Sequence, residues 1–95
     1  MNTLDRLQQW YLDQCDDEWE HSFGIKIDTL DNPGWSVTID LNDTNLANKP
    51  FQEISNLGPK SDWIRCWKEG TKFKGVCGPK NLQEILKTFT DWADI

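Results

Sequence analysis

Apolar residues near the start of the chain recur with the period of a helix. The stripe consists of Leu4, Leu7, Tyr11 and Cys15, with Trp10 beside it. Because positions three or four residues apart share one helix face, this spacing predicts a helix capped by Asn2 or Thr3. We expect the helix to end between Cys15 and Glu18, so that the acidic residues that follow lie in a loop.

A second helical pattern closes the sequence. Its apolar stripe consists of Leu82, Ile85, Leu86, Phe89 and Trp92. The helix is expected to start at Gly78-Pro79 or at Asn81. Asn81 and Glu84 have the spacing of a capping box, in which two side chains satisfy the first free amides of a helix.

Period-two alternation after the first helix predicts a hairpin. Its strands have apolar positions at Phe23, Ile25 and Ile27, and at Trp35, Val37, Ile39 and Leu41. The segment Asp31-Asn32-Pro33-Gly34 between them is a strong turn signal. Ile25 and Ile27 share a face with Val37 and Ile39 only if the loop holds three or five residues, and five would place Trp35 in the turn.

A second hairpin is predicted for residues 62–68 and 72–77, turning around Glu69-Gly70-Thr71. A loop of two residues puts one set of side chains on the face opposite Ile64 and Cys66: Trp63, Arg65, Trp67, Lys72 and Lys74. The lysines indicate that this face meets water and exposes the two tryptophans. A loop of three residues, or a bulge, would reverse the faces and bury both tryptophans.

Residues 43–60 form a long connection between the hairpins. Its apolar residues Leu46, Phe51, Ile54 and Leu57 are expected to anchor it, and a short helical turn at residues 50–55 is one option. The whole pattern predicts an α+β fold in the order α-β-β-β-β-α. It consists of an antiparallel four-stranded sheet with the N- and C-terminal helices packed on one face.

Charge divides the chain into unlike parts. The net charge of −6 combines −5 in residues 1–20 with +4 in residues 60–80. Overall acidity disfavours a general nucleic-acid-binding surface. No apolar run has the roughly 20 residues of a membrane span, and residues 1–14 lack the apolar core of a secretion signal, so a cytoplasmic location is expected. Cys15, Cys66 and Cys77 lack CxxC spacing and are expected to be reduced thiols.

The residues give little indication of catalysis. His21 is the only histidine, and with Asp16, Asp17 and Glu20 nearby it could form a weak metal site or an acid–base pair. No histidine is assignable to a cysteine nucleophile, and no phosphate-binding glycine motif occurs. We therefore expect no enzyme activity, no cofactor and no metal.

The tryptophans favour a role in protein binding. Trp10, Trp35 and Trp92 fit the apolar stripes, and Trp19 is expected to clamp the corner between the first helix and the first strand. Trp63 and Trp67, interleaved with Arg65, remain as candidates for an exposed binding face, because Trp and Arg are enriched at interface hot spots. Such a face could bind a partner or a second copy of the chain.

Nearly the whole chain resembles the immunity protein 53 family of bacterial polymorphic toxin systems. The resemblance lies in the runs Trp10-Tyr11, Gln14-Cys15-Asp16 and Trp19-Glu20-His21, and in Asp31-Asn32-Pro33-Gly34-Trp35-Ser36-Val37. Asp62-Trp63-Ile64 and Gly78-Pro79-Lys80-Asn81-Leu82 fit the same pattern. In this family a glycine often follows the aspartate of the QCD run, where this chain has Asp17. The departure raises the local charge and removes the glycine that a tight turn would use.

The resemblance implies that residues 1–95 are one immunity-protein domain, which binds and neutralises a cognate toxin without catalysis. Such toxins are often nucleases, and an acidic inhibitor suits a basic nuclease cleft. The candidates for toxin binding are the acidic residues and the histidine of this region: Asp13, Asp16, Asp17, Glu18, Glu20 and His21. Asp31, Asn32, Pro33 and Gly34 are expected to fix the hairpin instead. Neither the identity of the toxin nor a choice between monomer and homodimer follows from the sequence.

Overall fold

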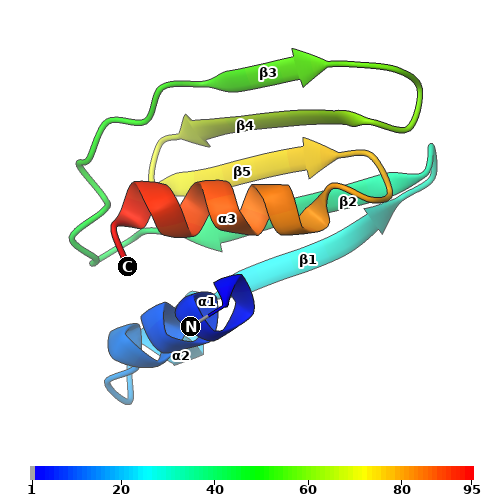
Figure 1. The fold of residues 1–95 in the computed structure, drawn as a ribbon. Helices are drawn as coiled ribbons and strands as arrows, with labels where there is room; N and C mark the ends of the chain where they lie inside the picture. Colours follow the sequence, from blue (N-terminus) through cyan, green and yellow to red (C-terminus); the bar gives the residue numbers. More distant parts are fainter. Residues whose placement is uncertain (1) are drawn as a thin grey trace.

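A five-stranded antiparallel sheet forms the body of the molecule (Figure 1). The structure is a computed structural model that describes residues 2–95, so Met1, where the predicted acidic segment begins, lies outside the described residues. The sheet has the order β1-β2-β5-β4-β3. Its strands are β1 (Ile25–Leu30), β2 (Gly34–Asp40), β3 (Ile54–Leu57), β4 (Trp63–Glu69) and β5 (Lys72–Cys77).

The prediction of four strands is wrong by one strand. Residues 54–57 form β3 and pair antiparallel with β4 at the edge of the sheet, and the optional helical turn at residues 50–55 does not form. All four residues of β3 are exposed, and Leu57, expected to anchor the connection, is 75% exposed. An edge strand held by backbone hydrogen bonds on one side needs no buried face, so its sequence shows no apolar alternation. Leu46 is buried, and Phe51 packs against the core.

Both predicted hairpin registers are confirmed. β1 and β2 pair Ile25 with Ile39 and Ile27 with Val37, with Leu30 opposite Gly34, so the loop holds three residues. Trp35 therefore lies in β2 and not in the turn. β4 and β5 pair Glu69 with Lys72, which leaves a loop of two residues. Gly70 in that loop has φ +59°, a conformation that glycine adopts without steric cost.

The helices are α1 (Thr3–Gln14), the short α2 (Trp19–Ser22) and α3 (Leu82–Ala93). α3 lies over β5 and β4, and α1 packs against α3 on the same face (Figure 1). Asn2 caps α1, because its Oδ1 accepts from the Asp5 amide at 2.8 Å. The capping box of α3 is wrong: the Asn81 side chain donates to Asp62 and Glu84 and caps no backbone amide.

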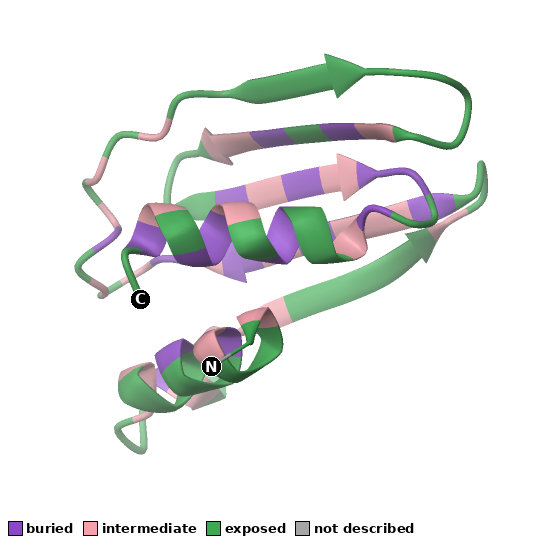
Figure 2. Ribbon diagram, in the orientation of Figure 1, coloured by how far each residue is buried: buried purple, intermediate pink, exposed green. Residues whose placement is uncertain are grey.

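The core lies between the sheet and α3, where Figure 2 shows the buried positions gathered. Its fully buried side chains include Val37, Ile39, Cys66, Phe73, Ile85 and Phe89. The predicted stripe of α3 faces this core. The stripe of α1 is rotated from the prediction, because Leu7 and Trp10 are buried while Leu4 is 57% exposed and Tyr11 is 39% exposed. Leu12, at 63% exposed, is the third large apolar side chain that α1 leaves at the surface.

Candidate functional site: an acidic corner

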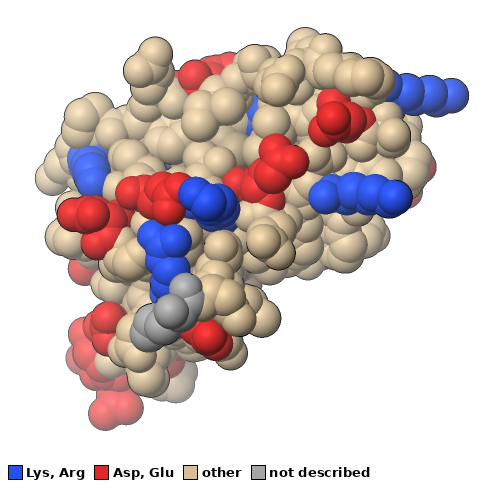
Figure 3. Space-filling model, viewed as in Figure 1, with Lys and Arg blue, Asp and Glu red and all other residues tan. Residues whose placement is uncertain are grey.

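The chain between α1 and α2 turns sharply and carries a cluster of carboxylates. We call this cluster the acidic corner; it consists of Asp13, Asp16, Asp17, Glu18 and Glu20. Figure 3 shows Asp and Glu atoms gathered where α1 and α2 meet. All of these residues are exposed except Glu20, which is half-buried. The sequence predicted these residues as candidates, and the fold brings them together because α1 ends at Gln14.

Two of the carboxylates build the turn. Asp16 Oδ1 accepts hydrogen bonds from the amides of Glu18 at 3.0 Å and Trp19 at 2.8 Å. Glu20 bonds in the opposite direction along the chain. Its two carboxylate oxygens accept hydrogen bonds from the amides of Asp16 and Asp17 at 3.0 Å each. These reciprocal bonds satisfy amides at the start of α2 that would otherwise lack partners. The corner is therefore a fixed arrangement of charges, not a flexible acidic loop.

Asp17 adopts a backbone conformation that usually requires glycine. Its φ is +75°, in the left-handed region, where a side chain is disfavoured and Asp is among the residues that tolerate it best. The turn that a glycine would make in the family pattern thus forms here with an aspartate. The tight turn therefore forms without glycine, contrary to the expectation. Asp17 also adds the negative charge that the sequence predicted.

The hydrogen bonds keep the corner ionised. The amide of Trp19, followed by that of Glu18, lowers the pKa of Asp16. Backbone amides also lower the pKa of Glu20, first its own amide and then those of Asp16 and Asp17. Donors that face a carboxylate favour its charged form. Both groups therefore carry full charge at neutral pH.

No described cation neutralises the acidic corner. Among residues 2–95, none of its five carboxylates forms an ion pair with Lys or Arg. Asp43 adds a further acid, because it lines a cleft of about 180 Å³ together with Asp16 and Glu18. Like charges held this close produce a strong negative potential, which favours a positively charged partner.

Trp19 fixes the acidic corner to the body of the protein. Its side chain is 5% exposed, and its Nε1 donates to the carbonyl of Asn42 at 2.7 Å. Its ring packs edge-on against Trp10 at 6.0 Å between ring centroids. The corner is thus tied both to α1 and to the loop that leaves β2.

His21 and the cysteines show no arrangement typical of catalysis. His21 is exposed in the last turn of α2, and the part of the chain from residue 2 to residue 95 holds no cluster of three or more His, Cys, Asp or Glu suited to a metal ion. Burial raises the pKa of the Cys66 thiol to about 12 and also raises that of Cys77. Protonated thiols are poor nucleophiles.

The second candidate surface is the open sheet face, which no helix covers. It carries Trp63, Arg65, Trp67, Lys72 and Lys74, with both tryptophans half-buried. The Arg65 guanidinium lies 4.4 Å from the centroid of the Trp67 ring. These side chains therefore lie on the face of the sheet that the sequence predicted to meet water.

Carboxylates compensate three cations that β4 and β5 place on the open sheet face. Arg65 pairs with Glu53 at 3.2 Å, Lys74 with Glu69 at 3.4 Å, and Lys72 with Asp40. Glu69 also accepts from Trp67 Nε1, and this bond, followed by Lys74, lowers its pKa. The three cations that this segment places on the open sheet face are thus each neutralised in space. This cancellation distinguishes the open sheet face from the acidic corner.

Residues 31–35, the predicted turn motif, make buried contacts that join neighbouring segments of the sheet. Gly34 is buried, and a Cβ at this position would lie 2.2 Å from the carbonyl oxygen of Cys77. The next residue, Trp35, donates from Nε1 to the Pro79 carbonyl at 3.0 Å. These contacts join β2 to β5 and to the segment that leads into α3. Asp31, Asn32 and Pro33 form the exposed loop itself.

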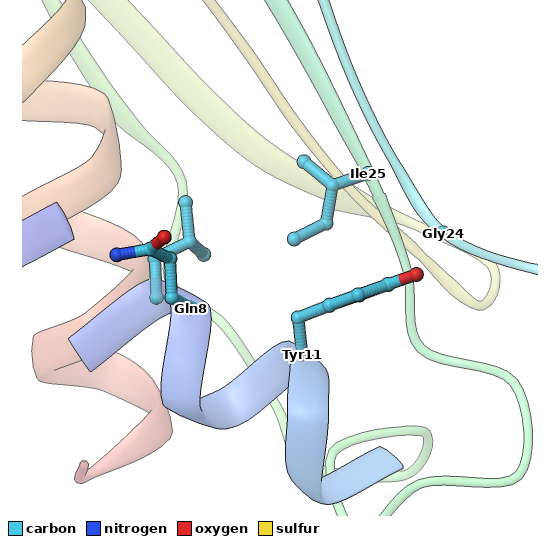
Figure 4. A pocket seen from close by; sticks show the side chains of 5 residues that line it. Gln8, Tyr11, Gly24 and Ile25 are labelled. Carbon is cyan, nitrogen blue, oxygen red and sulfur yellow. The ribbon is translucent and has the colours of Figure 1, made fainter. Parts of the chain in front are cut away.

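A further surface was not predicted from the sequence. An apolar groove between α1, α3 and β1 is lined by Leu4, Ile27, Leu82 and Leu86, and a second apolar pocket between α1 and β1 is lined by Leu7, Tyr11 and Ile25. Figure 4 shows Ile25 of β1 facing Tyr11 of α1 across this space. Leu4 and Ile27 were interpreted as core positions, and only their exposure in the fold reveals the groove.

Comparison with known proteins gives one informative match. The family model described as Immunity protein 53 matches residues 4–94. No characterised protein and no solved structure gives a significant match. Within residues 2–95, the helices are too short and too polar to cross a bilayer.

Proposed function

Because this chain belongs to the immunity protein 53 family, we propose that it binds a cognate bacterial polymorphic toxin and neutralises it by direct contact through the acidic corner. Residues 1–95 act as one immunity domain in the cytoplasm, with the toxin as partner and with no catalytic step or cofactor. The observation that carries the proposal is the uncompensated charge of the corner. Its carboxylates lack cationic partners among the described residues, whereas Arg65, Lys72 and Lys74 on the open sheet face are all paired.

The charge of the acidic corner suits a basic toxin surface, such as the active-site cleft of a nuclease. Opposite potentials steer two proteins together and can raise the association rate far above that of a neutral pair. The hydrogen bonds of Asp16 and Glu20 hold the corner in place before binding. Preorganised charges lose less conformational entropy when the complex forms. The corner therefore combines fast encounter with a low cost of ordering.

The test reverses charges that do not build the turn. Glu18 makes no capping hydrogen bond, and Asp13 accepts only from the exposed Gln9 side chain. The double variant Asp13→Lys/Glu18→Lys should therefore fold normally. A matched control, Asp5→Lys/Asp31→Lys, makes the same change in net charge at exposed sites outside the corner, where neither carboxylate has an ion-pair partner among the described residues.

We expect the corner variant to lose at least about tenfold in association rate with the toxin, and to depend less on salt. The control should stay within about threefold of the unmodified protein. Rates are measured by stopped-flow or surface plasmon resonance, with protection of toxin-expressing cells as a second readout. Equal rates for the two variants would overturn the role of the acidic corner and leave the family membership intact.

The open sheet face is the second candidate for toxin binding. The stacking of Arg65 on a half-exposed Trp67 joins the two residue types most typical of interface hot spots. If the toxin contacts this face, Trp67→Ala should weaken binding by more than about 2 kcal/mol. The same variant should leave binding unchanged if the acidic corner makes the contact.

A further inference from the structure

We propose that two copies of this chain pair through the outer edge of β1 and form a continuous ten-stranded sheet. β1 is an edge strand, and Figure 1 shows its Leu30 end standing clear of the described helices. The four central residues of the strand, Lys26 to Thr29, are exposed, and Figure 2 shows β1 as the exposed side of the fold. β1 holds no proline or bulge of the kind that protects many natural edge strands.

The hydrogen bonds beside β1 define which of its backbone groups point outward. The Asp40 amide donates to the Gly24 carbonyl at 3.0 Å, so these opposed residues form a hydrogen-bonded pair. The Leu41 amide donates to Thr71 at 2.8 Å, so odd-numbered residues of this segment bond toward β5. Bonding alternates along an antiparallel strand. The amides and carbonyls of Ile25, Ile27 and Thr29 therefore point to the open edge.

The side chains of β1 divide by face in a way that suits self-pairing. Ile25 and Ile27 share the helix-covered face with Ile39 and Val37, their partners on β2. Lys26 and Asp28 lie on the open face, opposite Thr38 and Ser36. An added strand must keep apolar with apolar and polar with polar, because a shift by one residue exchanges the faces. This condition allows only registers that pair odd residues with odd residues.

Charge selects one of these registers. If the two-fold axis passes through Ile27, then Lys26 of each copy faces Asp28 of the other, and two ion pairs form. Moving the axis by one residue along β1 sets Lys26 against Lys26, or Asp28 against Asp28, and like charges directly opposite are destabilising. Neither side chain has an ion-pair partner among residues 2–95. The sequence Ile25-Lys26-Ile27-Asp28-Thr29 is thus complementary to itself in one antiparallel register.

The same register covers exposed apolar surface. Ile27, 40% exposed, meets its own copy, and Leu4, 57% exposed, lies beside it in the apolar groove of about 610 Å³. A two-fold interface uses one patch twice, so each copy contributes the same strand and groove. A toxin strand could use the edge as well. The self-complementary charges at Lys26 and Asp28 favour a second copy as its occupant.

The proposal is tested with charge swaps at exposed positions. The full chain is studied by analytical ultracentrifugation over a wide concentration range. Lys26→Asp places Asp against Asp in the homodimer, and Asp28→Lys places Lys against Lys. Mixing the two variants restores both ion pairs, now between different chains. Lys60→Asp, an exposed residue away from β1, is the control for the change in net charge.

We expect the unmodified protein and Lys60→Asp to form a dimer of twice the monomer mass as concentration rises. Each β1 variant alone should dimerise at least about tenfold more weakly, and their mixture should give a one-to-one heterodimer. Monomers at every concentration, single variants that dimerise normally, or a mixture without heterodimer would each overturn the proposal. A monomer whose β1 variants bind toxin more weakly would assign the edge to the toxin instead.

Discussion

Gly34 offers a quantitative test of the idea that the turn motif is structural. The perturbation is Gly34→Ala, which adds one methyl group. That methyl carbon would lie 2.2 Å from the Cys77 carbonyl oxygen and 3.4 Å from the carbonyl carbon. Real Cβ atoms stay beyond 3.0 Å from such neighbours, and the crowded oxygen belongs to the backbone. β2 must therefore move away from β5, because no flexible side chain is present to make room.

The magnitude follows from two effects of that displacement. Overpacking of a tight site costs typically about 1–3 kcal/mol. Weakening a backbone hydrogen bond near the end of the β2–β5 ladder adds about 1 kcal/mol. The free energy of unfolding should therefore fall by about 2–4 kcal/mol. In a domain of this size the melting temperature should fall by roughly 10–25 °C.

Gly24→Ala is the matched control. It makes the same chemical change where no atom lies within 4 Å of the added carbon. It should leave stability within about 1 kcal/mol, with a small gain expected from the reduced entropy of the unfolded chain. Thermal and urea unfolding, followed by circular dichroism, measure both variants. A melting temperature of Gly34→Ala close to that of Gly24→Ala would refute the steric argument.

Three further predictions concern the acidic corner and the core. Because hydrogen bonds lower the pKa values of Asp16 and Glu20 below their ordinary 3.8 and 4.5, their contribution to stability is complete above those values. This stability contribution is lost as pH falls through the lowered pKa values. Between pH 7 and pH 3, urea unfolding should therefore show a smaller decrease in the free energy of unfolding for Asp16→Asn/Glu20→Gln than for the unmodified protein. Trp19→Phe removes part of a buried ring and leaves the Asn42 carbonyl without its donor. Urea unfolding should therefore show a loss of at least about 1–3 kcal/mol, and an unchanged midpoint would contradict both contributions. Gly75→Ala places a methyl carbon 2.8 Å from Ile85 Cγ2 and should destabilise the fold by about 1–3 kcal/mol. In a double-mutant cycle with Ile85→Ala, the double variant should lose less stability than the sum of the two single variants.

Much of the fold could be predicted because local signals and long-range pairing agree. The loop Asp31-Asn32-Pro33 and the alternation around it allow few registers, and the observed one pairs Ile27 with Val37. β3 could not be predicted, because Ser55 and Asn56 carry no strand pattern and the strand exists only through its pairing with β4. The exposure of Leu4 escaped prediction for a similar reason. A helical stripe identifies the apolar face of α1 but not how α1 is rotated against the sheet.

The candidate site, like the fold, could be predicted only in part. The sequence identified the acids around α2, yet not that Asp16 and Glu20 bind backbone amides while Asp13 and Glu18 remain free of that role. The charge count along the chain also indicated a positive segment, but Arg65 meets Glu53, which directly precedes β3, and Lys74 meets Glu69 at the end of β4. Net charge per segment is a property of the sequence. The potential at a surface depends on which strands lie next to each other.

Asp17 has a consequence for how immunity proteins and toxins diversify. Its left-handed conformation suits glycine without strain and aspartate at modest cost, so the turn keeps its shape with either residue. A single substitution there changes the charge at a surface while the scaffold stays as it was. If the acidic corner contacts the toxin as proposed, exchanging aspartate and glycine at this position would change the charge offered to the toxin, by repulsion as well as attraction, without changing the fold.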